Sequence, residues 1–391
     1  MEIEAIKYAI ESAKSAANKF AWPEVKAILN ETSHLSPTAS QEQKDQISFL
    51  SAQAFRGVGG QENRDQARSL ALSLLESTHI NLFDVLYLYL ETSFEEKQKD
   101  DLQQIVAQVE EWKKGAILEG LGESLSEFYR ISAEFELNGH NLDRNRDRIA
   151  YRKGMNAVRV VVENFTPSTD QEGIQQKRLL SFIIQSLAID YSFEQKIDKK
   201  TESLIEELFS HSEKLKEEVN DLHGLAINLG SRGSYHLFTT KKISIAREFL
   251  SRDLELCEQM GTRGDMSAIY NKLSMCDWID ANECTDADEK KLLQNNALQN
   301  AEKAFRLAVE LNRESDRAFA GFAVLEYARI NSNWPLIDEV GKNLDDEELW
   351  QIVLSSYAKS RVLEECKNLK GKGEWKWLES LQAKVSVSMD G

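Results

Sequence analysis

The stretch IEAIKYAIESAKSAANKF, residues 3–20, shows the pattern that decides the fold. Its apolar side chains recur every three or four residues, and charged side chains occupy many of the positions between them. Because one turn of an α-helix takes 3.6 residues, this spacing gathers the apolar groups on a single face. The stripe consists of Ile3, Ile6, Ala9, Ile10, Ala13, Ala17 and Phe20. The sequence therefore predicts an amphipathic helix that packs through one side.

The same pattern repeats along nearly the whole chain. Helices of roughly 10–20 residues alternate with short polar or glycine-containing turns, and the alternation typical of β-strands is almost absent. One helix start is marked by Ser40 with Gln43 three residues later, the pair found in a capping box. The apolar run 83–90 is rich in Leu and Tyr, which favours a buried helix. We expect about eight or nine antiparallel helical hairpins, stacked as an all-α, right-handed superhelical α-solenoid.

Boundaries within this array are weakly marked. The least regular stretch, residues 165–200, contains Pro167 and a run of lysines. We therefore divide the chain into an N-terminal array of hairpins, residues 1–165, and a C-terminal array, residues 166–391, with one continuous solenoid as the alternative. The last helix, residues 375–385, is expected to cap the end of the stack, where the final hairpin has no further neighbour.

Composition narrows the class of protein. The 391 residues include only 4 Pro and 19 Gly, with 41% hydrophobic and 29% charged residues, which indicates a folded helical chain and excludes a disordered one. The net charge of −17 makes the chain a poor general binder of nucleic acids and anionic membranes. The 4 cysteines fit neither a disulfide framework nor a CxxC zinc site, and no apolar stretch is long enough to span a bilayer. Since the N-terminus resembles no targeting segment, we expect a cytoplasmic protein with free thiols.

Short motifs in the C-terminal half carry a family resemblance. The segment AEKAFRLA, residues 301–308, has the spacing A-x3-F-x2-A and resembles the second helix of tetratricopeptide repeats. In that family the small residues let two helices approach closely, and the aromatic ring fills the space between hairpins. The triplet NLG at 228–230 and the segment IYNKL at 269–273 resemble first helices of the same family. Over about residues 220–340 the chain therefore looks like a divergent tetratricopeptide array.

The resemblance implies both a function and a set of residues. Tetratricopeptide arrays bind extended peptides along a groove lined by their first helices, where an asparagine reads the peptide backbone and Lys or Arg binds carboxylates. An amide suits this role because it offers a donor and an acceptor. The matching positions in this chain are Asn228, Arg232, Asn271 and Lys272. The leading interpretation is a non-catalytic scaffold, adaptor or regulatory subunit that binds a peptide or partner protein. The alternative at each position is a polar residue that contacts no ligand.

A basic segment supports a second interpretation. Its arginines recur at helical spacing, so one helix face presents a row of guanidinium groups. The row consists of Arg144, Arg148, Arg152 and Arg159. Such a row can bind phosphates bidentately, as in a nucleic-acid- or nucleotide-associated adaptor. The alternative is that acids of the chain neutralise it. The acids considered are Asp143, Asp147, Glu134 and Glu136.

Sequence signals of catalysis or of a metal site are weak. The six histidines include neither an HExxH motif nor a pair spaced by four residues. The acidic connection from residue 280 has Thr285 where a calcium loop needs glycine and Lys291 where it needs a bidentate acid. We predict no enzyme, no cofactor and no metal. An all-helical enzyme with a pocket assembled from distant residues is the third alternative.

Overall fold

The structure is a computed structural model that describes residues 2–19, 21–31, 37–95, 98–138, 144–194, 196–347, 349–350, 353, 359–373 and 375–387. All regular secondary structure in these residues is helical, as the periodicity predicts, and they contain no strand. The first helices along the chain are α1 (Glu2–Ala17), α2 (Trp22–Glu31), α3 (Gln41–Val58), α4 (Gln61–Ser73), α5 (Leu82–Phe94), α6 (Lys99–Lys114), α7 (Gly120–Asn138), α8 (Arg144–Asn164), α9 (Asp170–Ser192) and α10 (Lys199–Glu218). They are followed by α11 (Leu222–Tyr235), the π-helix η2 (His236–Thr240), α12 (Ile243–Met260), α13 (Arg263–Glu283), α14 (Ala287–Glu310), α15 (Glu314–Ile330), α16 (Trp334–Leu344), α18 (Lys359–Leu369) and α19 (Lys376–Val387).

The chain forms two compact units, which we describe separately. Unit 1 comprises Met1–Ser231 and Gln259–Gly261, and unit 2 comprises Arg232–Glu258 and Thr262–Gly391. The division therefore falls within α11. The connection near residue 165, where the sequence predicts a boundary, joins α8 to α9 inside unit 1.

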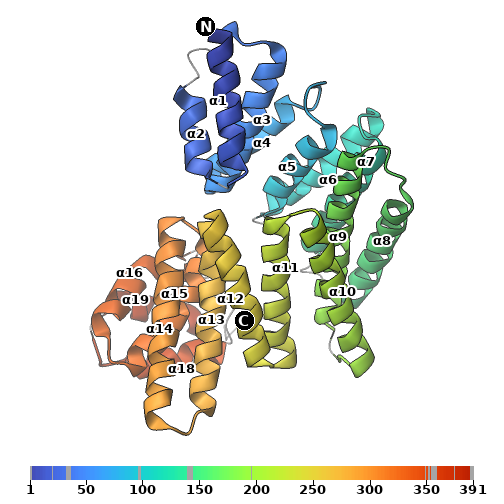
Figure 1. The fold of residues 1–391 in the computed structure, drawn as a ribbon. Helices are drawn as coiled ribbons and strands as arrows, with labels where there is room; N and C mark the ends of the chain where they lie inside the picture. Colours follow the sequence, from blue (N-terminus) through green and yellow to red (C-terminus); the bar gives the residue numbers. More distant parts are fainter. Residues whose placement is uncertain are drawn as a thin grey trace. The chain divides into compact units, whose positions relative to one another are not determined.

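From α1 to α10 and from α13 to α16, helices that follow one another along the chain pack together, and several alternate helices also touch. In unit 1, α1 contacts α3, α3 contacts α5, α5 contacts α7 and α7 contacts α9, while in unit 2 α13 contacts α15. Figure 1 shows the helices as antiparallel hairpins, for example α13 and α14. This packing is that of a tetratricopeptide-like α-solenoid, so the predicted fold class is confirmed. We use "first helices" for those that open a hairpin, which are α1, α3, α5, α7, α9, α11, α13 and α15.

The local signals of the N-terminal sequence are also confirmed. The backbone N–H of Gln43 donates to Ser40 Oγ at 3.2 Å, and the Ser40 N–H donates to Gln43 Oε1 at 3.0 Å, which completes the capping box of α3. Of the stripe on α1, Ile6, Ala9, Ile10 and Ala13 are buried in the core of unit 1. Ile3 at the helix start is 62% exposed, and Phe20 lies outside the described residues.

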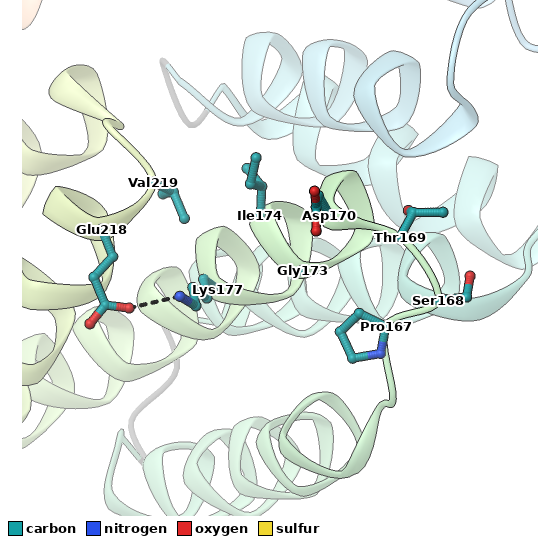
Figure 2. A pocket seen from close by; sticks show the side chains of 9 residues that line it. All are labelled: Pro167, Ser168, Thr169, Asp170, Gly173, Ile174, Lys177, Glu218 and Val219. Carbon is teal, nitrogen blue, oxygen red and sulfur yellow. Dashed lines mark ion pairs between the residues drawn. The ribbon is translucent and has the colours of Figure 1, made fainter.

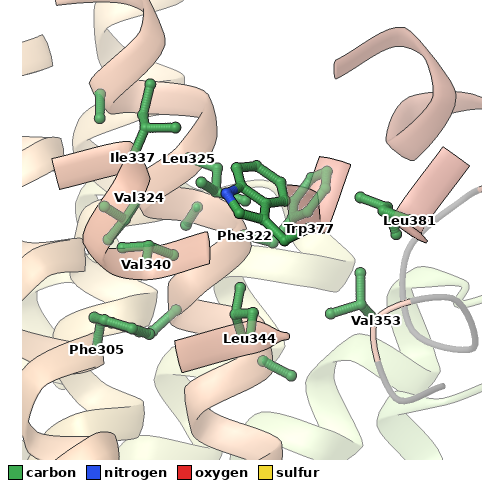
Figure 3. Packing of buried hydrophobic residues seen from close by; sticks show 14 of the residues in the cluster. Phe305, Phe322, Val324, Leu325, Ile337, Val340, Leu344, Val353, Trp377 and Leu381 are labelled. Carbon is green, nitrogen blue, oxygen red and sulfur yellow. The ribbon is translucent and has the colours of Figure 1, made fainter. Parts of the chain in front are cut away.

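The core of unit 2 contains the A-x3-F-x2-A residues of the repeat resemblance (Figure 3). Ala301 and Ala308 are fully buried, and Phe305 is 1% exposed. A Cβ added at Gly321 of α15 would lie 3.2 Å from Phe305 Cε2, so the ring of Phe305 directly contacts the next hairpin. The predicted roles of the small residues and of the aromatic ring are therefore both observed.

The end of the array is closed by aromatic residues. Trp377 and Leu381 of α19 are buried in the same core, together with Trp350 and Trp375. The helix α19 packs on α16 and α18, as expected for a capping helix. The indole of Trp377 lies so close to Gly341 of α16 that a Cβ at Gly341 would be 2.0 Å from Trp377 Nε1. Only glycine permits this approach.

Candidate functional site

The four residues predicted to bind a peptide differ in what their side chains contact. Asn228 on α11 belongs to unit 1 and is fully buried. Its amide Nδ2 donates to the backbone carbonyl of Phe209 on α10 at 3.1 Å. As placed, this amide joins α11 to α10 and faces no solvent, so a ligand could reach it only after α11 had moved.

Arg232 is the first residue of unit 2 and is half-buried. Its guanidinium carbon lies 4.3 Å from the ring centroid of Phe249 on α12. The same ring stacks on buried His236 of the π-helix η2, with centroids 5.7 Å apart. Cation–π contacts of this kind stabilise by about 0.5–2 kcal/mol, so Arg232 contributes to packing in its own unit.

Asn271 and Lys272 are neighbours on α13 in unit 2, and neither side chain is paired with a described residue. Both are half-buried. The amide of Asn271 makes no hydrogen bond to any described residue, although its Oδ1 atom is buried. Lys272 likewise has no ion pair within 4 Å among the described residues. Buried polar groups in folded proteins are nearly always hydrogen-bonded, so an unsatisfied amide requires an explanation.

Electrostatics around Lys272 come from several helices. Burial lowers the pKa of Lys272, whereas the carboxylates of Asp253, Asp316 and Asp265 act to raise it. These acids lie on α12, α15 and α13, respectively. The ammonium group of Lys272 is attracted by these acids but forms an ion pair with none of them. It can therefore form a direct ion pair with a carboxylate of a ligand.

A second group of side chains, which sequence reasoning missed, gathers on the first helices of unit 1. We call it the first-helix cluster, and it consists of Arg56 on α3, Tyr87 and Glu91 on α5, Arg178 and Phe182 on α9, and His223 on α11. The charged members are between 15% and 27% exposed. No short motif marks them, because they come from four helices that are far apart in sequence. Their shared property is that each lies on a first helix.

The first-helix cluster is held by ion pairs and by ring stacking. Arg56 Nη2 lies 2.7 Å from Glu91 Oε2, and His223 Nε2 lies 3.6 Å from Glu91 Oε1. The guanidinium carbons of Arg56 and Arg178 lie 5.8 and 5.9 Å from the Tyr87 ring centroid. The Tyr87 and Phe182 rings stack at 5.7 Å with an angle of 8° between their planes.

Burial and charge shift the ionisation of this cluster strongly. Burial opposes the charged form of Glu91, but the charge of Arg56 and hydrogen bonds from His223 and Tyr87 lower its pKa to about 2. Burial and the charge of Glu91 raise the pKa of Tyr87 well above its ordinary value. At neutral pH Glu91 is therefore ionised and Tyr87 is neutral. The cluster offers a carboxylate, two guanidinium groups and aromatic faces on one surface.

Three arginines of the predicted basic row, Arg148, Arg152 and Arg159, have partners within the chain. Arg152 pairs with Asp190, and its Nη1 lies 2.6 Å from Glu194 Oε1. Arg148 Nη1 donates to the backbone carbonyl of Phe193 at 2.6 Å. Arg159 Nε lies 2.7 Å from Glu163 Oε1. The partners of Arg148 and Arg152 come from the end of α9, not from the preceding helix α7 as the sequence suggested, and the side chain of Arg144 lies outside the described residues.

A surface pocket of 630 Å³ lies at the start of α9 in unit 1 (Figure 2). It is lined by Pro167, Ser168, Thr169, Asp170, Gly173, Ile174, Lys177, Glu218 and Val219. Two of the charged side chains here pair with each other, since Lys177 Nζ lies 2.9 Å from Glu218 Oε2. Glu172 accepts hydrogen bonds from the backbone and hydroxyl of Ser168, both at 2.6 Å, so an acid of the chain satisfies the helix start. The pocket contains no arrangement for acid–base catalysis.

The remaining sequence predictions concern metals, thiols and membranes. Within the described parts of the chain, no group of three or more His, Cys, Asp or Glu side chains is arranged to hold a metal ion. All four cysteines are free, and Cys257, Cys276 and Cys366 are buried. None of the described helices combines the length and the apolar character that crossing a membrane requires.

Comparisons with known proteins give similarity of structure only. No family model matches the chain, and no curated protein matches it. Among solved structures, the chain is similar to the crystal structure of a Rap protein complexed with competence and sporulation factor, with a TM-score of 0.45 and 8% identity over 99% of this chain and 98% of that one. It is also similar to the apo form of RapI, with a TM-score of 0.42 and 12% identity over 98% of each chain.

Proposed function

We propose that this chain is a non-catalytic scaffold that binds a peptide, or an extended segment of a partner protein, along its first helices. The observation that carries the proposal is the half-buried side chain of Asn271, whose amide makes no hydrogen bond to any described residue and whose Nδ2 is not enclosed as its Oδ1 is. A peptide backbone supplies both the N–H and the C=O that such an amide lacks. Lys272 beside it adds a cation for a carboxylate of the ligand.

The first-helix cluster of unit 1 supports the same function independently. Its side chains are preformed by stacking and ion pairs, so a ligand would bind without ordering them and would lose little binding energy to entropy. Its mixture of aromatic faces, guanidinium groups and a carboxylate suits a peptide with both polar and apolar side chains. We do not carry the nucleic-acid interpretation forward, because Arg148, Arg152 and Arg159 already have partners in the chain.

The proposal is tested with an immobilised library of random eight-residue peptides, N-acetylated and C-amidated. We expect the full chain to retain a subset of the library. Replacing Asn271 by Ala should weaken binding of the retained peptides by about tenfold, because the lost hydrogen bonds to a buried peptide are worth roughly 1–1.5 kcal/mol. The measurement is the dissociation constant of selected peptides by fluorescence anisotropy.

A matched control is Asn295→Ala on α14, since Asn295 is an exposed asparagine in the same unit. This variant should bind the selected peptides as the unchanged chain does. Equal affinities for the unchanged chain and Asn271→Ala would remove Asn271 from the binding surface. Failure to retain any peptide would count against the proposed function itself.

A further inference from the structure

Lys216 on α10 is fully buried in unit 1, which is rare for a lysine. Its ammonium nitrogen lies 2.5 Å from Gln185 Oε1 on α9 and 3.1 Å from Ser212 Oγ on α10. Both acceptors are neutral. Among the described residues no carboxylate lies within ion-pair distance of Lys216, and the acids that act on it from further away are Asp221 and Glu91. A charge in this position is poorly compensated.

The amine of Lys216 contacts the first-helix cluster. Its Nζ is 4.9 Å from the ring centroid of Phe182, the ring that stacks on Tyr87. The charged and titratable groups on the elements around it are Tyr87 and Glu91 on α5, Arg178 on α9, Asp221 in the turn before α11, and His223 on α11. Arg178 Nε and Asp221 Oδ2 are 4.0 Å apart, so this pair is weak and leaves Asp221 able to act on Lys216.

The first turn of α11 rests on Lys216 without a side chain between them. The backbone N–H of Gly224 donates to Asp221 Oδ1 at 3.0 Å. A Cβ at Gly224 would lie 3.0 Å from Lys216 Cε and 2.3 Å from Asp221 Oδ2. His223, in the same turn, reaches Glu91 on α5. Displacement of this turn would therefore both uncover Lys216 and separate His223 from Glu91.

The energetics follow from this geometry. Burial lowers the pKa of Lys216 to about 7, against an ordinary value of 10.5. Near neutral pH the amine is therefore close to half-charged. A buried ammonium without a carboxylate partner is strongly unfavourable, and exposing it to water relieves that cost. The neutral amine carries no such penalty, so protonation favours displacement of the turn.

We propose that Lys216 is a proton-dependent switch that keeps the first turn of α11 packed on α9 and α10 when neutral and releases it when charged. Release separates His223 from Glu91 and opens the first-helix cluster. Weaker ligand binding below neutral pH is a consequence that rests on the proposed function. The movement itself does not depend on it.

Protonation of His223 acts in the opposite direction, because a charged imidazole is attracted to ionised Glu91. The two titrations can be separated by substitution. Lys216→Met removes the amine and keeps an unbranched apolar side chain of similar length. Lys214→Met changes an exposed lysine on the same helix and is the matched control.

The experiment is amide hydrogen exchange of residues 225–230 in the full chain without ligand, at pH 6 and pH 8.5, corrected for intrinsic exchange rates. In the unchanged chain and in Lys214→Met, protection should be lower at pH 6 by at most about thirtyfold, because each pH unit between 8.5 and the pKa of about 7 in the closed chain favours opening tenfold. In Lys216→Met, protection at pH 6 should be no lower than at pH 8.5. The proposal is overturned if the unchanged chain shows no pH dependence or if Lys216→Met shows the same dependence.

Gln185→Glu keeps the test decisive if Lys216→Met does not fold. This change gives the ammonium a carboxylate in place of the amide oxygen at 2.5 Å. The charged lysine is then compensated, so protection of α11 should stay high at both pH values. Persistence of the low protection at pH 6 in Gln185→Glu would also overturn the proposal. None of these readouts uses a peptide, so they succeed or fail independently of the proposed function.

Discussion

Phe305 makes the packing between α14 and α15 depend on a single side chain. It is 1% exposed and contacts Gly321 on the next hairpin. Phe305→Ala should lower the free energy of unfolding by about 3–5 kcal/mol, because truncation leaves a cavity that the neighbouring helices cannot close. Urea unfolding followed by circular dichroism measures the loss.

The control is Phe193→Ala, which removes a ring that is 63% exposed and should lower the free energy of unfolding by less than about 1 kcal/mol. Similar losses for the two variants would mean that Phe305 does not fill the space between hairpins.

Single residues also show where sequence reasoning stops. Asn228 and Asn271 both lie on first helices and both match the family position by pattern. In the structure Asn228 Nδ2 donates to the Phe209 carbonyl while its Oδ1 has no partner, whereas neither polar atom of the Asn271 amide has a partner among the described residues. The contact of Asn228 is made across helices, with α10 of the preceding hairpin. Helical periodicity gives the face of a residue but not the distance to the next helix.

At the scale of elements, the hydrophobic period was sufficient to predict the helices. It could not predict which helix neutralises the basic row on α8. The sequence offered acids of the preceding helix, yet Asp190 and Glu194 at the end of α9 are the partners. In a hairpin array the second helix packs on its own partner and on the first helix of the next pair. The ion pair of Arg152 therefore joins two hairpins. Which acids it reaches depends on how α8 and α9 align when the hairpins pack.

The ion pair between Arg152 on α8 and Asp190 on α9 should contribute measurably to the free energy of unfolding of unit 1. Arg152→Met should destabilise unit 1 by about 2–3 kcal/mol, because it leaves the buried carboxylate of Asp190 with only the more distant Arg148. The matched control is Arg159→Met, whose partner Glu163 lies on the same helix. A local pair of this kind contributes less than about 1 kcal/mol. Both values come from urea unfolding at low salt, and equal losses would contradict a role for Arg152 between hairpins.

At the scale of the whole molecule, the division into two units predicts how the chain unfolds. Solenoid stability is a sum of terms within hairpins and between neighbours, so distant parts need not unfold together. Helical circular dichroism reports on both units, which consist of helices throughout their described residues. Tryptophan fluorescence is weighted toward unit 2, because Trp278, Trp334, Trp350, Trp375 and Trp377 belong to it and only Trp22 and Trp112 belong to unit 1.

Urea unfolding followed by the two signals should therefore give two different transitions, since coincident probes are the mark of a two-state molecule. Phe305→Ala, in unit 2, should move the fluorescence transition to lower urea and shift only part of the dichroism curve. Arg152→Met, in unit 1, should shift the other part of the dichroism curve and leave the fluorescence midpoint nearly unchanged. Superimposable curves in the unchanged chain and in both variants would instead show that the units unfold as one cooperative body. In that case the stability of each hairpin would be set by the whole array and not by its neighbours.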